Sequence, residues 1–215
     1  FKTMRSNSEL RKDARATMSG NWLDGVVISL VSMLMMGLVA SPQIVTAEGS
    51  VSGYVIYMLA YLFIGAPISY GLYFAFLKFC RSAELKVENL FGLFNSKYYI
   101  KSICLFLLTT IYTYLWSLLL VIPGIIKGLS YSMAPYILLD NPEITAEEAI
   151  CRSMEMMRGH KMDLFLMGLG YAGLAILSCF LLCIPLLWLA PYYVTVLTKF
   201  YEDLKAEQVR EIPIQ

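Results

Sequence analysis

Hydroxyl side chains recur at helical spacing in the segment TTIYTYLWS, which is the clearest candidate for a polar site in this 215-residue chain. Thr109, Thr113 and Ser117 are spaced i, i+4, i+8, so a helix would place them on one face. Such a face can line a path for a small solute, or it can let two helices approach closely. The candidate polar pocket adds one lysine and three tyrosines, and comprises Lys127, Thr109, Thr113, Ser117, Tyr70, Tyr131 and Tyr192.

The three tyrosines recur every 61 residues, which is a sign of an internal repeat. The stretches that begin at Glu84 and Glu143 also align without gaps, at an offset of 59 residues. A real repeat would give three helical hairpins whose tyrosines converge on one path. Chance similarity between apolar helices would give the same matches, so both interpretations stand.

Lys127 and Asp24 are ionisable groups inside otherwise apolar stretches. A charge in a bilayer is costly, so it marks either a functional site or a side chain that reaches water. Lys127 can extend its ammonium to the outer headgroups, line a polar pocket or bind an anionic substrate. Asp24 follows Trp22 closely, so water or nearby basic residues can satisfy it at the cytoplasmic edge.

A second candidate site is the basic group around the sequence RGHKMD. These cations can contact lipid phosphates at the inner leaflet, or they can be an ordinary basic flank of a cytoplasmic loop. His160 is the single histidine and has cationic neighbours, which argues against a base or a metal ligand. The candidate lipid contact comprises Arg152, Arg158, His160 and Lys161.

No motif for catalysis or metal binding accompanies these residues. The sequence has no nucleophile elbow, P-loop, paired carboxylates or HExxH motif. Its five cysteines form no CxxC pair and are expected to be small buried apolar residues. A net charge of +1 gives the chain no electrostatic preference for nucleic acid. We therefore expect no catalytic residues, metal, cofactor or nucleic-acid partner, and a protein that is not an enzyme.

The composition indicates which elements position these side chains. Hydrophobic residues make up 58% of the chain and charged residues 15%, whereas soluble domains average about 45–50% and about 25%. The mean hydropathy is +0.63, so we expect burial in a membrane, where helices of roughly 20 apolar residues can cross. The sequence predicts six such spans, at 22–39, 51–79, 102–122, 125–139, 163–184 and 186–200.

The distribution of lysine and arginine predicts the orientation of these spans. The N-terminal segment and the stretch 78–101 each hold five such residues, whereas the loop 41–50 holds none. Because basic loops stay in the cytoplasm, both termini are expected there. Pro123–Gly124 is then an outer turn, and Gly65–Pro67 a bend in the long second span. The expected fold class is an all-α polytopic membrane bundle of six transmembrane helices in three hairpins.

Three amphipathic stretches between the spans are expected to form a cytoplasmic collar on the inner leaflet. The first begins with a capping box from Ser6 to Glu9, and the third is capped by Thr145. Their apolar faces comprise Leu10, Ala14 and Met18; Val87, Leu90, Phe91 and Phe94; and Ala146, Ala149, Ile150, Ser153 and Met157.

The spans and the amphipathic stretches together predict one membrane domain, 1–215. It is divided into an amphipathic segment 1–21, a first hairpin 22–79, an amphipathic segment 80–101, a second hairpin 102–139, a cytoplasmic helix 140–162, a third hairpin 163–200 and a tail 201–215.

Two stretches resemble domain-of-unknown-function family 975, polytopic membrane proteins of Gram-positive bacteria. They are IPGIIKGLSYSMAPYILLDNPEITAEEAICRSMEMMRGHKMDLF and WLAPYYVTVLTKFYEDL, which cover most of Ile122 to Leu204. A more distant similarity is to the membrane domain found beside some glycerophosphodiester phosphodiesterases. The resemblance implies a helical bacterial membrane protein and brings no activity, substrate or catalytic residue. One departure is Ala190–Pro191, where the family pattern has more glycine.

These features predict a plasma-membrane protein that acts as a scaffold or accessory subunit, through helix packing and the cytoplasmic collar. The alternative is a permease or channel for a small or amphipathic solute, which would use the candidate polar pocket. The expected partners are anionic lipids at the cytoplasmic face, and either further copies in a homo-oligomer or another membrane protein.

Overall fold

Every regular element that the structure describes is helical, as the apolar runs predict. The structure is a computed structural model that describes residues 5–45, 51–82, 84–94, 96–180 and 185–211. The elements are α1 (Asn7–Met18), α2 (Trp22–Val45), α3 (Val51–Ala60), η1 (Tyr61–Gly65), α4 (Ala66–Ser82), η2 (Val87–Phe94), α5 (Ser96–Leu119), α6 (Val121–Tyr131), α7 (Ala134–Asp140), α8 (Ala146–Met156), α9 (Lys161–Phe180) and α10 (Leu186–Glu211). The all-α class expected from the sequence is confirmed.

Four stretches of described helix are long and apolar enough to cross a membrane: Trp22–Val39, Gly53–Ser82, Lys97–Leu119 and Lys161–Ser178. They correspond to the first, second, third and fifth predicted spans. The predicted fourth span is divided between α6 and α7, and the predicted sixth forms the first part of α10, whose second half is charged. The number of six spans is therefore not confirmed.

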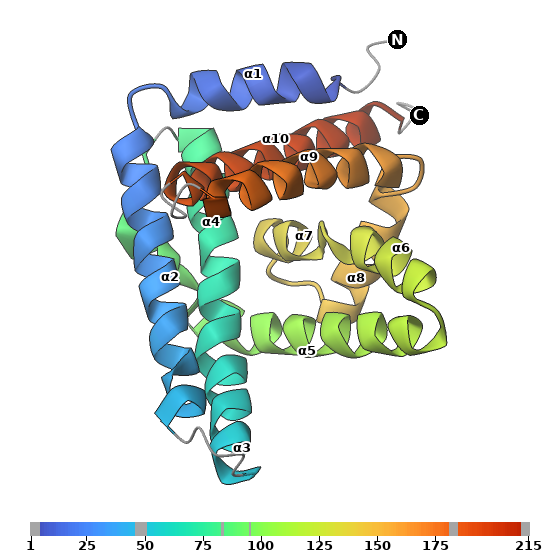
Figure 1. Cartoon of the computed structure of the whole chain (residues 1–215). Helices are drawn as coiled ribbons and strands as arrows, with labels where there is room; N and C mark the ends of the chain where they lie inside the picture. The colour runs from blue at the N-terminus through green and yellow to red at the C-terminus, as the bar shows by residue number, and fades with distance from the viewer. Residues whose placement is uncertain (1–4, 46–50, 83, 95, 181–184, 212–215) are drawn as a thin grey trace.

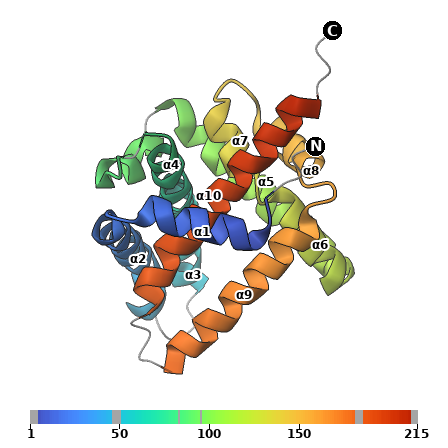
Figure 2. The ribbon, with the colours of Figure 1, turned by 90° about the horizontal axis from the view of Figure 1, so that it is seen from above.

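Helices that are neighbours in the chain pack as pairs: α2 against α3 and α4, α5 against α6, and α9 against α10. Figure 1 shows that these pairs do not share one direction, because α5, α9 and α10 run across the hairpin of α2 and α4. Seen from above, α1 lies over α10, with α9 running obliquely (Figure 2). Neighbouring helices thus contact each other in pairs, but the pairs run in different directions, and the expected three hairpins of spans are not confirmed.

The long second helix contains a π-helical turn, η1, directly before Pro67, where the sequence predicts a bend. Proline has no N–H to donate to the preceding turn, and π turns are a usual site of local bending in helices. The helix resumes as α4 at Ala66.

The chain reverses from α5 to α6 at Leu120, whose backbone is extended, with φ −163° and ψ 143°. Pro123 and Gly124 therefore lie in the first turn of α6, and the prediction that they form the turn is wrong. Proline is accepted there because the N–H groups of a first helical turn have no partner within the helix. Gly124 permits a close crossing, since an added Cβ would lie 2.2 Å from the Oγ of Ser117 on α5.

The predicted fourth span is interrupted at Ser132–Met133, between α6 and α7. Pro135 follows the interruption and cannot donate to a carbonyl of the previous turn. The hydroxyl of Ser153, from α8, donates to the carbonyl of Ser130 at 2.7 Å and accepts from the N–H of Met133 at 3.2 Å. Ser153 is 0% exposed, so α8 provides partners for two backbone groups that the break would leave unpaired.

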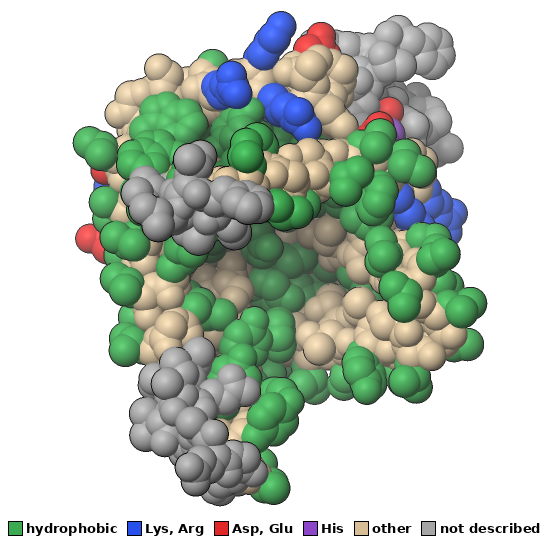
Figure 3. Space-filling view, in the orientation of Figure 1, with side chains coloured by type: hydrophobic (Ala, Val, Ile, Leu, Met, Phe, Trp, Pro, Cys, Tyr) green, Lys and Arg blue, Asp and Glu red, His purple; other side chains and the backbone are tan. Residues whose placement is uncertain are grey.

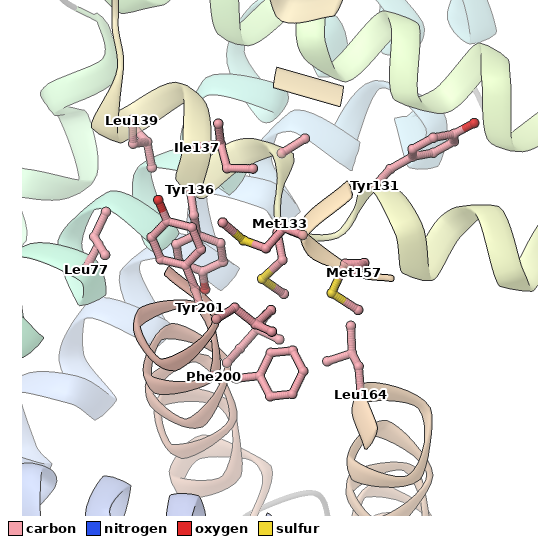
Figure 4. Packing of buried hydrophobic residues seen from close by; sticks show 14 of the residues in the cluster. Leu77, Tyr131, Met133, Tyr136, Ile137, Leu139, Met157, Leu164, Phe200 and Tyr201 are labelled. Atoms are coloured by element: carbon pink, nitrogen blue, oxygen red, sulfur yellow. The ribbon is translucent and has the colours of Figure 1, made fainter. Parts of the chain in front are cut away.

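The hydrophobic core gathers around this break, as Figure 4 shows for residues of α7, α9 and α10. The ring of Tyr136 stacks on Tyr201 with centroids 5.0 Å apart, and lies 5.3 Å from the ring of Tyr73. Tyr136 is fully buried, and its hydroxyl is hydrogen-bonded to that of Thr198 at 3.3 Å. The break therefore directs α7 into the interior.

Two of the three collar stretches bury their apolar faces in the protein itself. Leu10, Ala14 and Met18 are fully buried where α1 packs on α10. The face of α8 packs against α5, α6 and α7. The faces, the capping box of Ser6 and the cap of Thr145 were predicted correctly, but the expected lipid contact of these two faces is wrong. In η2, by contrast, the exposed apolar side chains are Val87, Phe91 and Phe94, while Leu90 is buried.

Ser153→Ala is expected to lower the free energy of unfolding by about 2–4 kcal/mol, because it leaves a buried carbonyl and a buried N–H without partners. Unfolding in mixed micelles with increasing SDS measures the effect. Ser130→Ala is the matched control, since the Ser130 hydroxyl only donates to the Ile126 carbonyl within α6, and a loss below about 1 kcal/mol is expected. Equal losses in the two variants would contradict the bridging role of Ser153.

Candidate functional site

The C-terminal part of the hydroxyl stripe of α5, at Thr113 and Ser117, lies at the seam between α5 and α6. Its residue Ser117 touches Gly124, and an added Cβ at Gly128 would lie 3.8 Å from the Cγ2 of Thr113. The hydroxyls of Thr109 and Ser117 donate to carbonyls one turn earlier in α5, each at 2.8 Å. Small residues on both helices thus bring the backbones together, as in close helix pairs generally.

Lys127 and Tyr131 lie on the same helix pair. The ammonium of Lys127 is 4.8 Å from the ring centroid of Trp116 on α5, which is a cation–π contact. The rings of Tyr131 and Tyr112 are 6.3 Å apart. These contacts join α6 to α5 and bring Lys127 and Tyr131 near the hydroxyl stripe.

A hollow of about 500 Å³ lies between the interrupted α6–α7 segment and α9, and we call it the central hollow. Figure 3 shows the surface hollowed in this region, between α9 and α5, with hydrophobic side chains around it. Gly168 and Ala172 of α9 lie on its wall. The full lining is Tyr70, Tyr73, Gly128, Leu129, Ser132, Pro135, Leu164, Phe165, Gly168, Leu169, Ala172, Tyr193 and Leu197.

The three repeated tyrosines are not brought to one place. Tyr70 lines the central hollow, whereas Tyr192 lines a different hollow near the junction of α1 and α2. Tyr131 belongs to neither lining and packs on α5. Tyrosines at equal spacing in the sequence therefore do not meet at one site in the structure, because the three helix pairs cross one another.

Three of the four residues of the candidate lipid contact lie beside carboxylates. Arg152 pairs with Glu148 at 2.7 Å, and the Nε2 of His160 is 3.4 Å from Glu207. Arg158 and His160 line a pocket of about 360 Å³ with Glu155 and Glu207, and Lys161 begins α9. The mixed charge of this region would oppose a lipid phosphate as well as attract it.

Asp24 lies in the first turn of α2 and is exposed, and its expected position near an interface stays a prediction. The positive end of a helix dipole favours a carboxylate there. No group of three or more His, Cys, Asp or Glu side chains suited to a metal ion occurs among the described residues.

The sequence interpretation missed Asp140, the last residue of α7. Its side chain is 5% exposed and accepts hydrogen bonds from Arg81 at 2.6 and 2.9 Å, from Tyr201 at 2.7 Å and from Lys205 at 2.5 Å. Arg81 also pairs with Glu202 at 2.7 Å. This ionic cluster joins the ends of α4 and α7 to α10.

Burial by itself would raise the pKa of the Asp140 carboxyl, but the hydrogen bonds from Arg81, Lys205 and Tyr201 outweigh burial and lower that pKa to about 2. A signal was available in the sequence. A carboxylate at the C-terminal end of an apolar helix is opposed by the helix dipole, so it requires cationic partners from elsewhere.

The comparisons with known proteins give one match. A family model described as "Protein of unknown function (DUF975)" matches residues 4–127 and 117–208. No curated protein and no solved structure matches the chain. The matched residues extend through nearly all of the described helices, so the resemblance inferred from the C-terminal half applies to the whole chain.

Asp140→Asn is expected to lower the free energy of unfolding by about 2–3 kcal/mol at pH 7, because Arg81 and Lys205 lose their buried partner. Since the pKa is lower in the folded state, this stabilisation is present above about pH 4 and is lost as the pH falls toward 2. The difference between wild type and variant, followed by unfolding from pH 7 to pH 3, should therefore shrink. Glu143→Gln is the control, because the Lys97–Glu143 pair is exposed and is worth about 0–1 kcal/mol. A difference independent of pH would contradict the ionic role of Asp140.

Proposed function

The chain belongs to the DUF975 family of proteins of unknown function, and from this premise we propose that it is a membrane protein without enzymatic activity. In this proposal it is a scaffold or an accessory subunit that acts by helix packing. It crosses the plasma membrane six times with both termini in the cytoplasm, and associates with further copies of itself. The observation that carries the proposal is an uncovered heptad stripe on α5.

The outer face of α5 is apolar and largely uncovered. Only 11% of the apolar 18-residue window in the span Lys97–Leu119 is buried within the chain, the lowest share of the four candidate spans. A subset of its exposed side chains follows spacings of four and three residues, which is the heptad spacing of a helix–helix seam. This α5 stripe comprises Ile100, Cys104, Leu107, Ile111, Tyr114 and Leu118.

The stripe lies opposite the seam that α5 makes with α6, so the helix can pack on both sides. Helices in a bilayer associate by close packing of side chains, because lipid tails are as apolar as leucine. A regular heptad stripe offers this packing to an identical stripe on a second copy. That geometry supports self-association more directly than it supports a catalytic role.

The ionic groups also support a role without catalysis. Arg5 pairs with Asp13 at 2.9 Å and with Asp203 at 2.5 Å, and Arg81 pairs with Asp140 and Glu202. A general acid or base needs an ionisable group within reach of a substrate. In the linings of the central hollow, the described residues are apolar, aromatic or hydroxyl-bearing.

Cys104 provides a test of the α5 stripe, since it is exposed within that stripe and not buried as the sequence predicted. Oxidation of the full chain in nanodiscs with copper phenanthroline is expected to give disulfide-linked dimers, read on non-reducing gels. Cys151 on α8 is also exposed and serves as the control. Cys104→Ser should lose the disulfide-linked dimer, whereas Cys151→Ser should retain it. A monomer in native mass spectrometry, or dimers that persist in Cys104→Ser, would refute the stripe as the interface.

A second candidate function is a permease for a small or amphipathic solute, and the central hollow favours it. The hollow adjoins the interrupted helix at Ser132 and has tyrosines on its wall. Interrupted helices beside a hollow are a feature of several transporter sites. The permease candidate is weakened because the hydroxyl stripe and Lys127, which were expected to form its path, lie outside the lining of the central hollow.

A larger side chain at Gly168 can narrow the central hollow, and the same change at Gly173 provides a control. An added Cβ at Gly168 meets no atom within 4 Å, and the same is true of Gly173, which lies on α9 outside the lining. If the hollow conducts, Gly168→Leu should reduce uptake of the amphipathic dye rhodamine 6G into proteoliposomes by about tenfold, because the path narrows. Gly173→Leu should leave uptake unchanged. Uptake equal to that of protein-free liposomes in the wild type would exclude the dye-permease form of this candidate.

A further inference from the structure

We propose that a second hollow, of about 640 Å³ at the junction of α1, α2 and the α9–α10 hairpin, binds one anionic phospholipid. Its acyl chain would lie along the apolar wall and its phosphate at the guanidinium of Arg15. We call this site the hairpin groove. The proposal is independent of whether the chain is a scaffold or a permease.

The walls of the hairpin groove suit a hydrocarbon chain. Leu174 and Leu177 from α9 line it together with Pro185 and Leu189 from the start of the α10 side. A volume of this size is typical of sites for small molecules. Two tryptophans, of the kind that prefer the membrane interface, complete the lining. The residues of the lining are Arg15, Trp22, Leu174, Leu177, Ser178, Pro185, Trp188, Leu189 and Tyr192.

The charge of the groove is located at one end. Arg15 is its single ionisable cation, and its guanidinium carbon lies 5.6 Å from the ring centroid of Tyr192. The rings of Tyr192 and Trp22 are 6.3 Å apart, so the cation is held at an aromatic corner. The opposite end, at Pro185, is apolar. A cation at one end of an apolar groove is complementary to an amphiphile with an anionic head.

Arg11 lies one turn before Arg15 on α1 and adds a second observation. Its guanidinium carbon is 5.8 Å from the ring of Tyr171, and its Nε is buried without a hydrogen-bond partner. Within the described part of the chain neither Arg11 nor Arg15 forms an ion pair. The carboxylates near α1 are engaged elsewhere, because Asp13 and Asp203 both bind Arg5. Arg11 lies outside the lining of the groove, but it adds an unpaired positive charge one turn from Arg15, and unpaired guanidinium groups favour a phosphate.

Asp24 is the acidic group nearest to the groove in sequence, two residues after Trp22. It is exposed and does not belong to the lining. It therefore leaves the charge of Arg15 available to a ligand.

The tryptophans of the groove supply the measurement. The chain has three tryptophans, so Trp116→Phe leaves Trp22 and Trp188, both of which line the groove. This variant is placed in phosphatidylcholine nanodiscs with a small fraction of brominated phosphatidylglycerol or brominated phosphatidylcholine. Bromine quenches tryptophan on contact, and the anionic lipid is expected to quench at a clearly lower mole fraction.

The headgroup contact is tested by removing one charge. Arg15→Gln is expected to reduce the preference for phosphatidylglycerol by about tenfold or more, because a hydrogen bond to a charged group is lost. Lys12→Gln is the matched control, since Lys12 and Arg15 are both exposed on α1 but only Arg15 lines the groove, and it should keep the preference. Arg15→Lys should retain part of it, which separates loss of charge from a folding defect. Equal losses in Arg15→Gln and Lys12→Gln would overturn the site.

The occupant is tested by two further changes. Leu177→Phe narrows the groove and should weaken quenching by both brominated lipids, whereas Ile176→Phe, at the exposed neighbouring position outside the lining, should not. Inorganic phosphate at constant ionic strength should leave the preference intact. If inorganic phosphate abolishes it, the site is one for free phosphate and the lipid proposal is wrong. If Leu177→Phe has no effect, no chain enters the groove.

Discussion

The hydroxyl of Ser153 is the contact on which the rest of this fold depends, because it allows an apolar segment to stop being a helix inside the protein. One oxygen serves the carbonyl of Ser130 and the N–H of Met133 across the gap between α6 and α7. Irregular backbone is stable in an apolar environment only where such partners exist. The gap then directs Tyr136 into the aromatic core and brings Asp140, at the end of α7, to Arg81 and its neighbours.

Helical periodicity identified the apolar faces correctly and did not identify what covers them. The faces of α1 and α8 have the pattern of interfacial helices, yet α10 covers the first, and α5, α6 and α7 cover the second. An amphipathic pattern requires only an apolar neighbour, which lipid and protein provide equally well. The helix that covers α1 lies far away in the sequence, as the pair of Arg5 with Asp203 across 198 residues shows, and no local pattern contains that information.

The positions of the candidate site residues were predictable only where their partners are close in the sequence. Close packing along the α5 hydroxyl stripe was predictable, because Thr113 and Ser117 meet glycines in the next helix of the chain. Convergence of Tyr70, Tyr131 and Tyr192 depended on parallel hairpins, and the hairpins cross (Figure 1). The ionic cluster of Asp140 was signalled only by a carboxylate at an unfavourable helix end. Its partners lie in α4 and α10, so they become visible only when these three helices, distant in the sequence, meet.

The packing of α1 along α10 links the hairpin groove to the proposed membrane orientation. Contacts from Arg5 with Asp203 to Arg15 with Tyr192 show that the two helices run antiparallel over this length. Both helices run across α2 and α4 at the end where α2 begins (Figure 1). In the proposed orientation α2 and α4 cross the bilayer and this end faces the cytoplasm, so Arg15 lies at the level of the inner headgroups, where its guanidinium can meet a lipid phosphate. The apolar walls of the groove then meet the acyl chain of the same lipid.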